Sequence, residues 1–352
     1  MNINKTSNFF GNINKENSFA EKNNEKKVKS ELHQDLFWTF RILIVFFKLI
    51  GLATFVHRIV IYKKRTSYTF QYSKLGIVYN VVLSSLMIAS NYMSIPYRIN
   101  DDYDEKTNLT VGIEVLQAVL GALVMCAILI SYCIDQKFLV RIANQLIIIE
   151  YEIDHLYDLY YSLRRQRIFY TIIIVCILKI CLLILLLCTE ILGIQKGPVS
   201  WLSDVLPTFY VGWLLIQYFL LVTVIQTDFA DVNRAIQSLI NTPDFRLQSL
   251  YQTRRIVVNN SAVHQLLQLR DVHCHLCEMS NDVSSFYSLP VLFGIIFLFL
   301  TLIYNGYWVL VPLLKKTLDY GILSNGIIWI IFLIYPISLL TNKITSILIE
   351  VG

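Results

Sequence analysis

The sequence predicts an all-α fold: a polytopic bundle of membrane-spanning helices with helical extensions in the cytoplasm. Apolar residues make up 55% of the 352 positions, and they are concentrated in runs long enough to cross a bilayer. Only 16% of the residues are charged, against about 25% in soluble domains. This composition disfavours a soluble enzyme and a disordered protein. The net charge of +5 is also too small and too scattered for a surface that binds nucleic acid.

The first part of the chain, residues 1–30, is polar and rich in Asn and Lys, and we expect it to be a disordered cytoplasmic tail. Residues 31–60 are predicted to hold an amphipathic helix, because the stretch 36–56 is apolar except on one face. Arg41 and Lys48 lie seven residues apart, so both charges fall on that face. We favour a helix that lies at the membrane interface, and the alternative is a seventh span.

Six segments meet the requirement of about 20 mostly apolar residues for a helix that crosses the membrane. They form a predicted transmembrane bundle over residues 73–341 and comprise residues 73–97, 112–134, 168–192, 203–227, 286–314 and 322–341. The third segment carries two charges, Lys179 and Glu190, and the last two segments carry none.

The basic residues between these segments predict the orientation. With the N-terminus in the cytoplasm, and with residues 1–57 left out of the count, fifteen Lys and Arg residues outside the six segments fall on the cytoplasmic side and five on the outer side. The outer five are Arg98, Lys106, Lys196, Lys315 and Lys316. Since cytoplasmic loops of membrane proteins carry the excess of positive charge, we predict a multi-pass membrane protein with a cytoplasmic N-terminus. We further expect it in the plasma membrane.

Two helical segments, residues 135–167 and 228–285, are predicted to continue below the membrane. In the first, apolar residues recur at alternating spacings of three and four, which is a heptad pattern. These residues are Leu139, Ile142, Leu146, Ile149, Ile153, Leu156, Tyr160 and Leu163. A second apolar stripe runs through Leu269, Val272 and Leu276 into the fifth span. We expect the two stripes to pack against each other, and the alternative for the first is a helix on the membrane surface.

Aromatic residues gather in the outer halves of two spans and are our candidates for a ligand pocket. They are Phe209, Tyr210 and Trp213 in the fourth span, and Tyr304, Tyr307 and Trp308 in the fifth. Aromatic side chains at this depth either form the interface belt of a membrane protein or line an apolar pocket for a small molecule.

Lys179 lies in the middle of the third span, and a charge within the membrane is a candidate for a functional residue. The alternatives are a side chain that faces the interior of the bundle and one that extends to the membrane surface. We include Lys179 among the candidate ligand-binding residues.

Common motifs that bind phosphate, activate a nucleophile or hold catalytic zinc do not occur in the sequence. We therefore predict that the protein is not an enzyme and has no cofactor. Cys274 and Cys277 have the two-residue gap of zinc sites, but no second ligand pair follows at the spacing of a zinc finger. We predict no metal site there.

Residues 273–292, with the sequence HCHLCEMSNDVSSFYSLPVL, lead into the aromatic-rich fifth span. His273 is followed three residues later by Leu276, and the pair Tyr287-Ser288 precedes the apolar run. These residues form the motif that we compare with known families.

The motif and its place in the chain resemble the insect gustatory receptors, within the wider insect chemoreceptor superfamily. Ser284 stands where the family usually has Asn. Residues 47–54, FKLIGLAT, are similar to the family's amphipathic entry segment. The organisation also agrees: a cytoplasmic N-terminus and a long cytoplasmic segment before the fifth span.

The resemblance implies a ligand-gated, non-selective cation channel that detects small-molecule tastants. It also implies a homo- or hetero-tetramer with other gustatory receptor subunits, surrounded by membrane lipid and binding no nucleic acid. The family's last helix lines the pore and carries a Thr-Tyr…Gln-Phe signature that residues 342–352 do not supply. We expect a truncated C-terminus, and the alternatives are a splice form and a subunit that cannot conduct alone.

Two other functions compete with this interpretation: a seven-helix G-protein-coupled receptor and a small-solute transporter. The first requires the N-terminus outside, which the distribution of basic residues opposes. A proton-coupled transporter is expected to have several paired charges in the membrane and an internal repeat, neither of which the sequence contains.

Overall fold

The computed structural model describes residues 42–62, 65–100, 108–156, 161–191, 198–241, 260–315 and 320–351. The chain divides into two compact units, residues 1–50 and 51–352. The predicted tail and the start of the predicted interfacial helix lie outside the described residues. In the first unit, the described part is helical over residues 42–49.

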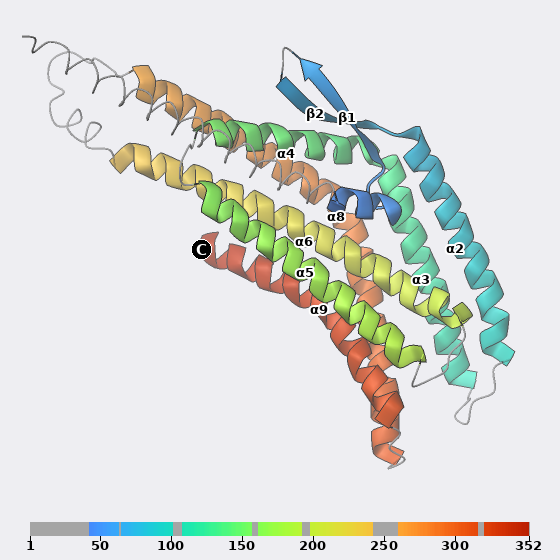
Figure 1. Ribbon diagram of the computed structural model, residues 1–352. Helices are drawn as coiled ribbons and strands as arrows, with labels where there is room; N and C mark the ends of the chain where they lie inside the picture. The colour runs from blue at the N-terminus through green and yellow to red at the C-terminus, as the bar shows by residue number, and fades with distance from the viewer. Residues whose placement is uncertain are drawn as a thin grey trace, which may run out of the picture. The chain divides into compact units, whose positions relative to one another are not determined.

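The second unit is a bundle of long helices (Figure 1). They are α2 (Lys74–Asn100), α3 (Asn108–Ile134), α5 (Tyr161–Thr189), α6 (Pro198–Asn241), α8 (Asn260–Lys315) and α9 (Tyr320–Val351). In the part of the chain that the structure describes, these six helices are long and apolar enough to cross a membrane. The predicted fold class, a polytopic helical membrane bundle, is therefore confirmed.

Helix α6 forms the centre of this bundle. In its most apolar stretch 72% of the residues are buried, against 17–39% in the other five helices. It packs against α2, α3, α5, α8 and α9. Protein therefore surrounds most of the apolar stretch of α6, whereas the other helices leave large apolar side chains exposed, as is required in contact with lipid.

Helix α4 (Gln136–Leu156) follows α3 after a turn at Asp135 and lies beside the first part of α8 (Figure 1). The two predicted apolar stripes meet here: Ile142 and Ile149 of α4 and Leu276 of α8 are all buried. Two polar contacts join the same helices, at 3.4 Å between Arg141 and Asp282 and at 3.5 Å between Glu152 and His275. The cytoplasmic location of this pair stays a prediction.

Along the chain, a β-hairpin precedes α2, and the sequence analysis did not predict it. Strand β1 (Phe55–Tyr62) pairs antiparallel with β2 (Arg65–Tyr72), with Phe55 opposite Tyr72. The helix predicted over residues 31–60 is therefore wrong for residues 55–60. The physical reason is the run of β-branched and aromatic residues in both segments, which favours strands.

The side chain of Asn144 in α4 completes the edge of this hairpin. Its Oδ1 accepts a hydrogen bond from the Phe70 N–H at 2.8 Å, and its Nδ2 donates to the Phe70 carbonyl at 3.1 Å. One amide side chain thus pairs both backbone groups of a residue on an otherwise open strand edge.

Residues Gly51–Thr54 form a loop that is buried among the helices of the second unit. Asn80 donates to the Gly51 carbonyl at 2.9 Å, and Gln217 donates to the Leu52 carbonyl at 3.1 Å. Gln136 donates to the Thr54 carbonyl, and the Thr54 hydroxyl donates to the carbonyl of Tyr132 at 3.1 Å. Side chains from α2, α4 and α6 therefore replace the water that this irregular backbone loses on burial.

Candidate functional site

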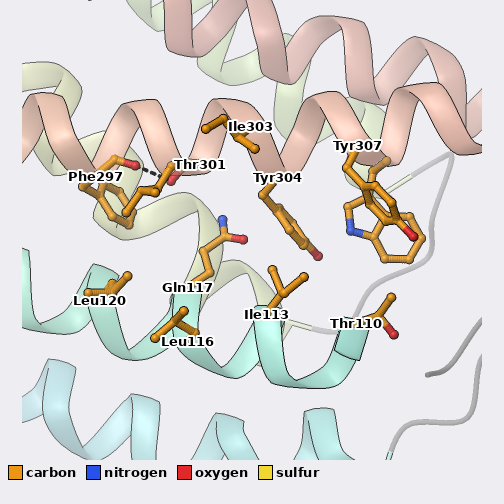
Figure 2. A pocket seen from close by; sticks show the side chains of 12 residues that line it. Thr110, Ile113, Leu116, Gln117, Leu120, Phe297, Thr301, Ile303, Tyr304 and Tyr307 are labelled. Atoms are coloured by element: carbon orange, nitrogen blue, oxygen red, sulfur yellow. Dashed lines mark hydrogen bonds between the residues drawn. The ribbon is translucent and has the colours of Figure 1, made fainter. Parts of the chain in front are cut away.

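A cavity of about 290 Å³ lies between α3 and α8 and is the candidate ligand site (Figure 2). The wall contributed by α3 consists of Thr110, Ile113, Leu116, Gln117 and Leu120. The wall contributed by α8 consists of Phe297, Leu300, Thr301, Ile303, Tyr304, Tyr307 and Trp308. Spacings of three and four recur in both sets, so each helix lines the cavity with one face.

The polar groups of the cavity are few. The Thr301 hydroxyl donates to the carbonyl of Phe297 at 2.8 Å, so it is satisfied within its own helix. The Tyr304 hydroxyl donates to Glu114 Oε1 at 3.2 Å. Figure 2 shows Tyr304 of α8 and Gln117 of α3 both extending into the space between the two helices. An apolar ligand with one hydrogen-bonding group matches such a lining.

The three aromatic residues predicted in the fifth span lie together in the wall of this cavity. The rings of Tyr304 and Tyr307 each stand edge-on to Trp308, with centroids 6.2 Å apart in both pairs. Aromatic pairs prefer this arrangement because the positive ring edge meets the negative ring face. The side chain of Tyr307 keeps 48% of its surface exposed, so part of its ring is open to a ligand.

The three aromatic residues predicted in the fourth span do not line this cavity. Trp213 and Tyr210 are 1% and 4% exposed, and both pack against Phe209 with ring centroids 6.1 Å apart. All three lie on α6, the central helix, where protein buries Tyr210 and Trp213 and covers Phe209 in part. Their role in ligand binding stays a prediction.

Lys179 also lies away from the cavity, on α5. It is 1% exposed and donates from Nζ to the Phe332 carbonyl of α9 at 3.1 Å. The structure thus shows the interior-facing alternative for this lysine.

The second charge of the predicted third span, Glu190, directly follows α5 and belongs to a polar cluster that the sequence analysis missed. Glu190 is 3% exposed and accepts hydrogen bonds from Asn325 Nδ2 at 3.0 Å and from Trp329 Nε1 at 2.7 Å. The sequence could have indicated this cluster, because a lone carboxylate at the end of a span needs hydrogen-bond donors from another helix.

The family-motif residues all lie on α8 and fall into two groups. Leu276 and Tyr287 are buried, and the Tyr287 ring lies 5.2 Å from that of Tyr218 on α6. The remaining three, His273, Ser284 and Ser288, are exposed. The motif therefore combines packing positions with exposed polar positions, and none of its residues lines the cavity.

The His273 ring lies near two neighbouring side chains. Its Nδ1 is 3.7 Å from the sulfur of Cys277, and its centroid is 5.5 Å from the ring of Phe229 on α6. This placement matches a packing contact at the surface of α8.

The α3 wall of the cavity was not predicted. Its residues recur on one face of the second span, beside Glu114, and this spacing was the available signal. The pairing with α8 was not visible in the sequence, because Glu114 and Tyr304 are separated by 190 positions along the chain.

Comparison with protein families gives one match to report, a family described as 7tm chemosensory receptor, over residues 40–346. The matched range contains the buried loop, the hairpin and both walls of the cavity. A comparison with curated proteins found no match.

Proposed function

Because the chain belongs to the 7tm chemosensory receptor family, which is that of the insect gustatory and odorant receptors, we propose that it is a gustatory receptor for small-molecule tastants. In this proposal it acts as a subunit of a ligand-gated, non-selective cation channel. The resemblance drawn from residues 273–292 is confirmed at the level of the family. The family and the multi-pass helical fold favour a chemoreceptor over an enzyme.

The observation that carries the proposal is the cavity between α3 and α8. Its volume of about 290 Å³ lies just below the range of about 300–1,000 Å³ for ligand pockets. An aromatic cluster at one end and the Gln117 amide on the facing wall would bind a small, mostly apolar molecule with one polar group.

We further propose a plasma-membrane protein with a cytoplasmic N-terminus, assembled as a tetramer with itself or other gustatory receptor subunits. The orientation is supported by the excess of basic residues in the segments of the sequence that contain α4 and the first part of α8. The cavity is lined by the start of α3 and the later part of α8, so in this orientation it opens in the outer half of the membrane. A ligand would then enter from outside the cell.

We expect Tyr307→Ala to weaken the response to an activating compound. The substitution removes a half-exposed ring from the cavity wall, and loss of such a contact costs about 1–2 kcal/mol, or roughly 5–30-fold in half-maximal concentration. The measurement is a dose–response curve of ligand-evoked current, with surface expression determined on the same cells.

The matched control is Phe299→Ala on the same helix. Phe299 is aromatic and 58% exposed, and it is not part of the cavity wall. Its removal should leave the dose–response curve within about twofold of wild type. Equal curves for Tyr307→Ala and wild type, at equal surface expression, would remove the α3–α8 cavity from ligand recognition.

The channel mechanism is tested by recording ligand-evoked currents in cells in which G-protein signalling is blocked, with partner subunits co-expressed. A ligand-gated channel keeps its current, and a G-protein-coupled receptor loses it. The orientation is tested separately with a protease and an N-terminal tag. A tag digested on intact cells contradicts the proposed topology.

A further inference from the structure

Pro336 lies inside α9 and leaves one backbone carbonyl without its usual partner. Proline has no N–H, so the carbonyl four residues earlier, that of Phe332, cannot form the helical hydrogen bond. In a membrane this is costly, because no water is available to replace the missing donor.

The buried lysine of α5 supplies the missing donor. Lys179 Nζ donates to the Phe332 carbonyl at 3.1 Å and also lies 3.2 Å from the centroid of the Phe332 ring. A carbonyl dipole and an aromatic face are both favourable partners for an ammonium group. The contact therefore satisfies two groups at once: it gives the buried lysine an acceptor, and it gives the Phe332 carbonyl the donor that Pro336 cannot supply.

Gly212 of α6 provides the space for this contact. A Cβ built at Gly212 would lie 2.9 Å from Lys179 Nζ, which is closer than atoms of this kind approach without displacement. The ammonium group is therefore enclosed by three helices, α5, α6 and α9, and its position is restricted from each side.

The part of α9 before Pro336 is attached at further points to α5 and to Glu190, the residue that directly follows α5. Asn325 and Trp329 donate to Glu190, and the Tyr335 hydroxyl donates to the Val175 carbonyl at 3.1 Å. Like the contact of Lys179 with Phe332, these contacts come from positions before Pro336.

We propose that Lys179 is a positioning residue that sets the bend of α9 at Pro336. By satisfying the freed Phe332 carbonyl, it selects one geometry of the proline hinge and so directs the part of α9 that follows. The inference goes beyond the proposed function, and it applies whichever compound the receptor detects.

The test is a double-mutant cycle with a distance measurement. Lys179→Met removes the donor and keeps an unbranched side chain, while Pro336→Ala restores a backbone N–H for Phe332. Spin labels are attached through a ketone-bearing amino acid that replaces Ser324 and Ile344, both exposed on α9. Pulsed electron resonance on the full-length protein in lipid then reports the distance across the hinge.

With Pro336 present, we expect Lys179→Met to shift or broaden the label distance by roughly 2 Å or more, as a change of bend at a proline requires. In the Pro336→Ala background the same substitution should change it by less than half as much, because the carbonyl then has its own donor. Lys74→Met, at an exposed lysine of α2, serves as the control and should leave the distance unchanged.

An unchanged distance for Lys179→Met would overturn the proposal, and so would equal shifts in the two backgrounds. If Lys179→Met does not reach the membrane, the proposal is tested by the surface yield of the double variant, which carries both Lys179→Met and Pro336→Ala. A yield restored toward that of Pro336→Ala supports the hinge, and an equally low yield contradicts it. None of these outcomes requires channel activity, so the result is independent of the proposed function.

Discussion

Substitution of Gly51 by alanine is expected to lower the free energy of unfolding by about 2–4 kcal/mol, since it combines backbone strain with a steric clash. Gly51 has a φ of 80°, a conformation that favours glycine because side chains at other residues collide with the backbone there. A Cβ at this position would also lie 2.6 Å from Asn80 Oδ1 and 3.0 Å from Leu129 Cδ2. The substitution therefore pushes the buried loop away from the groups that satisfy its carbonyls.

The measurement is thermal unfolding of the purified protein in detergent, together with the fraction that reaches the cell surface. Gly306→Ala is the matched control, because Gly306 is helical and a Cβ there meets nothing within 4 Å. Alanine at an open helical position is expected to be neutral or slightly stabilising. A Gly51→Ala protein as stable as the Gly306→Ala protein would show that the loop tolerates displacement.

Gln217→Leu is expected to be similarly damaging, at about 2–5 kcal/mol, because it leaves two buried polar groups without partners. The Gln217 amide donates to the Leu52 carbonyl at 3.1 Å and accepts a hydrogen bond from the Tyr132 hydroxyl at 2.7 Å. Gln217 is 8% exposed, so water does not readily replace it. Leucine has a similar size, which separates the loss of hydrogen bonds from the loss of volume.

Tyr132→Phe tests the same network from the other side. It removes one hydrogen bond and keeps the ring that packs 5.0 Å from Phe286, so it should cost roughly half as much as Gln217→Leu. In the double variant the two costs should not add, because both substitutions remove the same bond. Gln265→Leu, at an exposed position of α8, should leave the unfolding temperature unchanged. Fully additive costs would contradict a shared network.

The predicted amphipathic helix over residues 31–60 shows where sequence reasoning failed. Periodicity indicated an apolar face, but it did not show that the chain turns at Gly51 and continues as a strand from Phe55. The groups that make this path possible come from distant parts of the chain: Gln217 reaches the loop across 165 positions. A buried loop needs donors from its surroundings, and these donors are known only once the helices are packed.

The candidate site was likewise predictable from the sequence only in part. The aromatic character of Tyr304, Tyr307 and Trp308 was visible in the sequence, but the same pattern in Phe209, Tyr210 and Trp213 was equally persuasive. The structure distinguishes them through α6, which is surrounded by other helices and buries Tyr210 and Trp213. Helix α8 instead faces α3 across a gap that side chains do not fill.

By itself the sequence determined a polytopic helical membrane protein, the approximate positions of six spans and the resemblance to a chemosensory family. These properties depend on local composition, because a helix in lipid needs a continuous apolar run whatever its neighbours are. Only the tertiary structure decided which faces meet: the hairpin edge bound by Asn144, the cavity between α3 and α8, and the contact of Lys179 with a carbonyl freed by Pro336. Each of these joins residues from distant helices, and a pattern along one helix does not specify its partner.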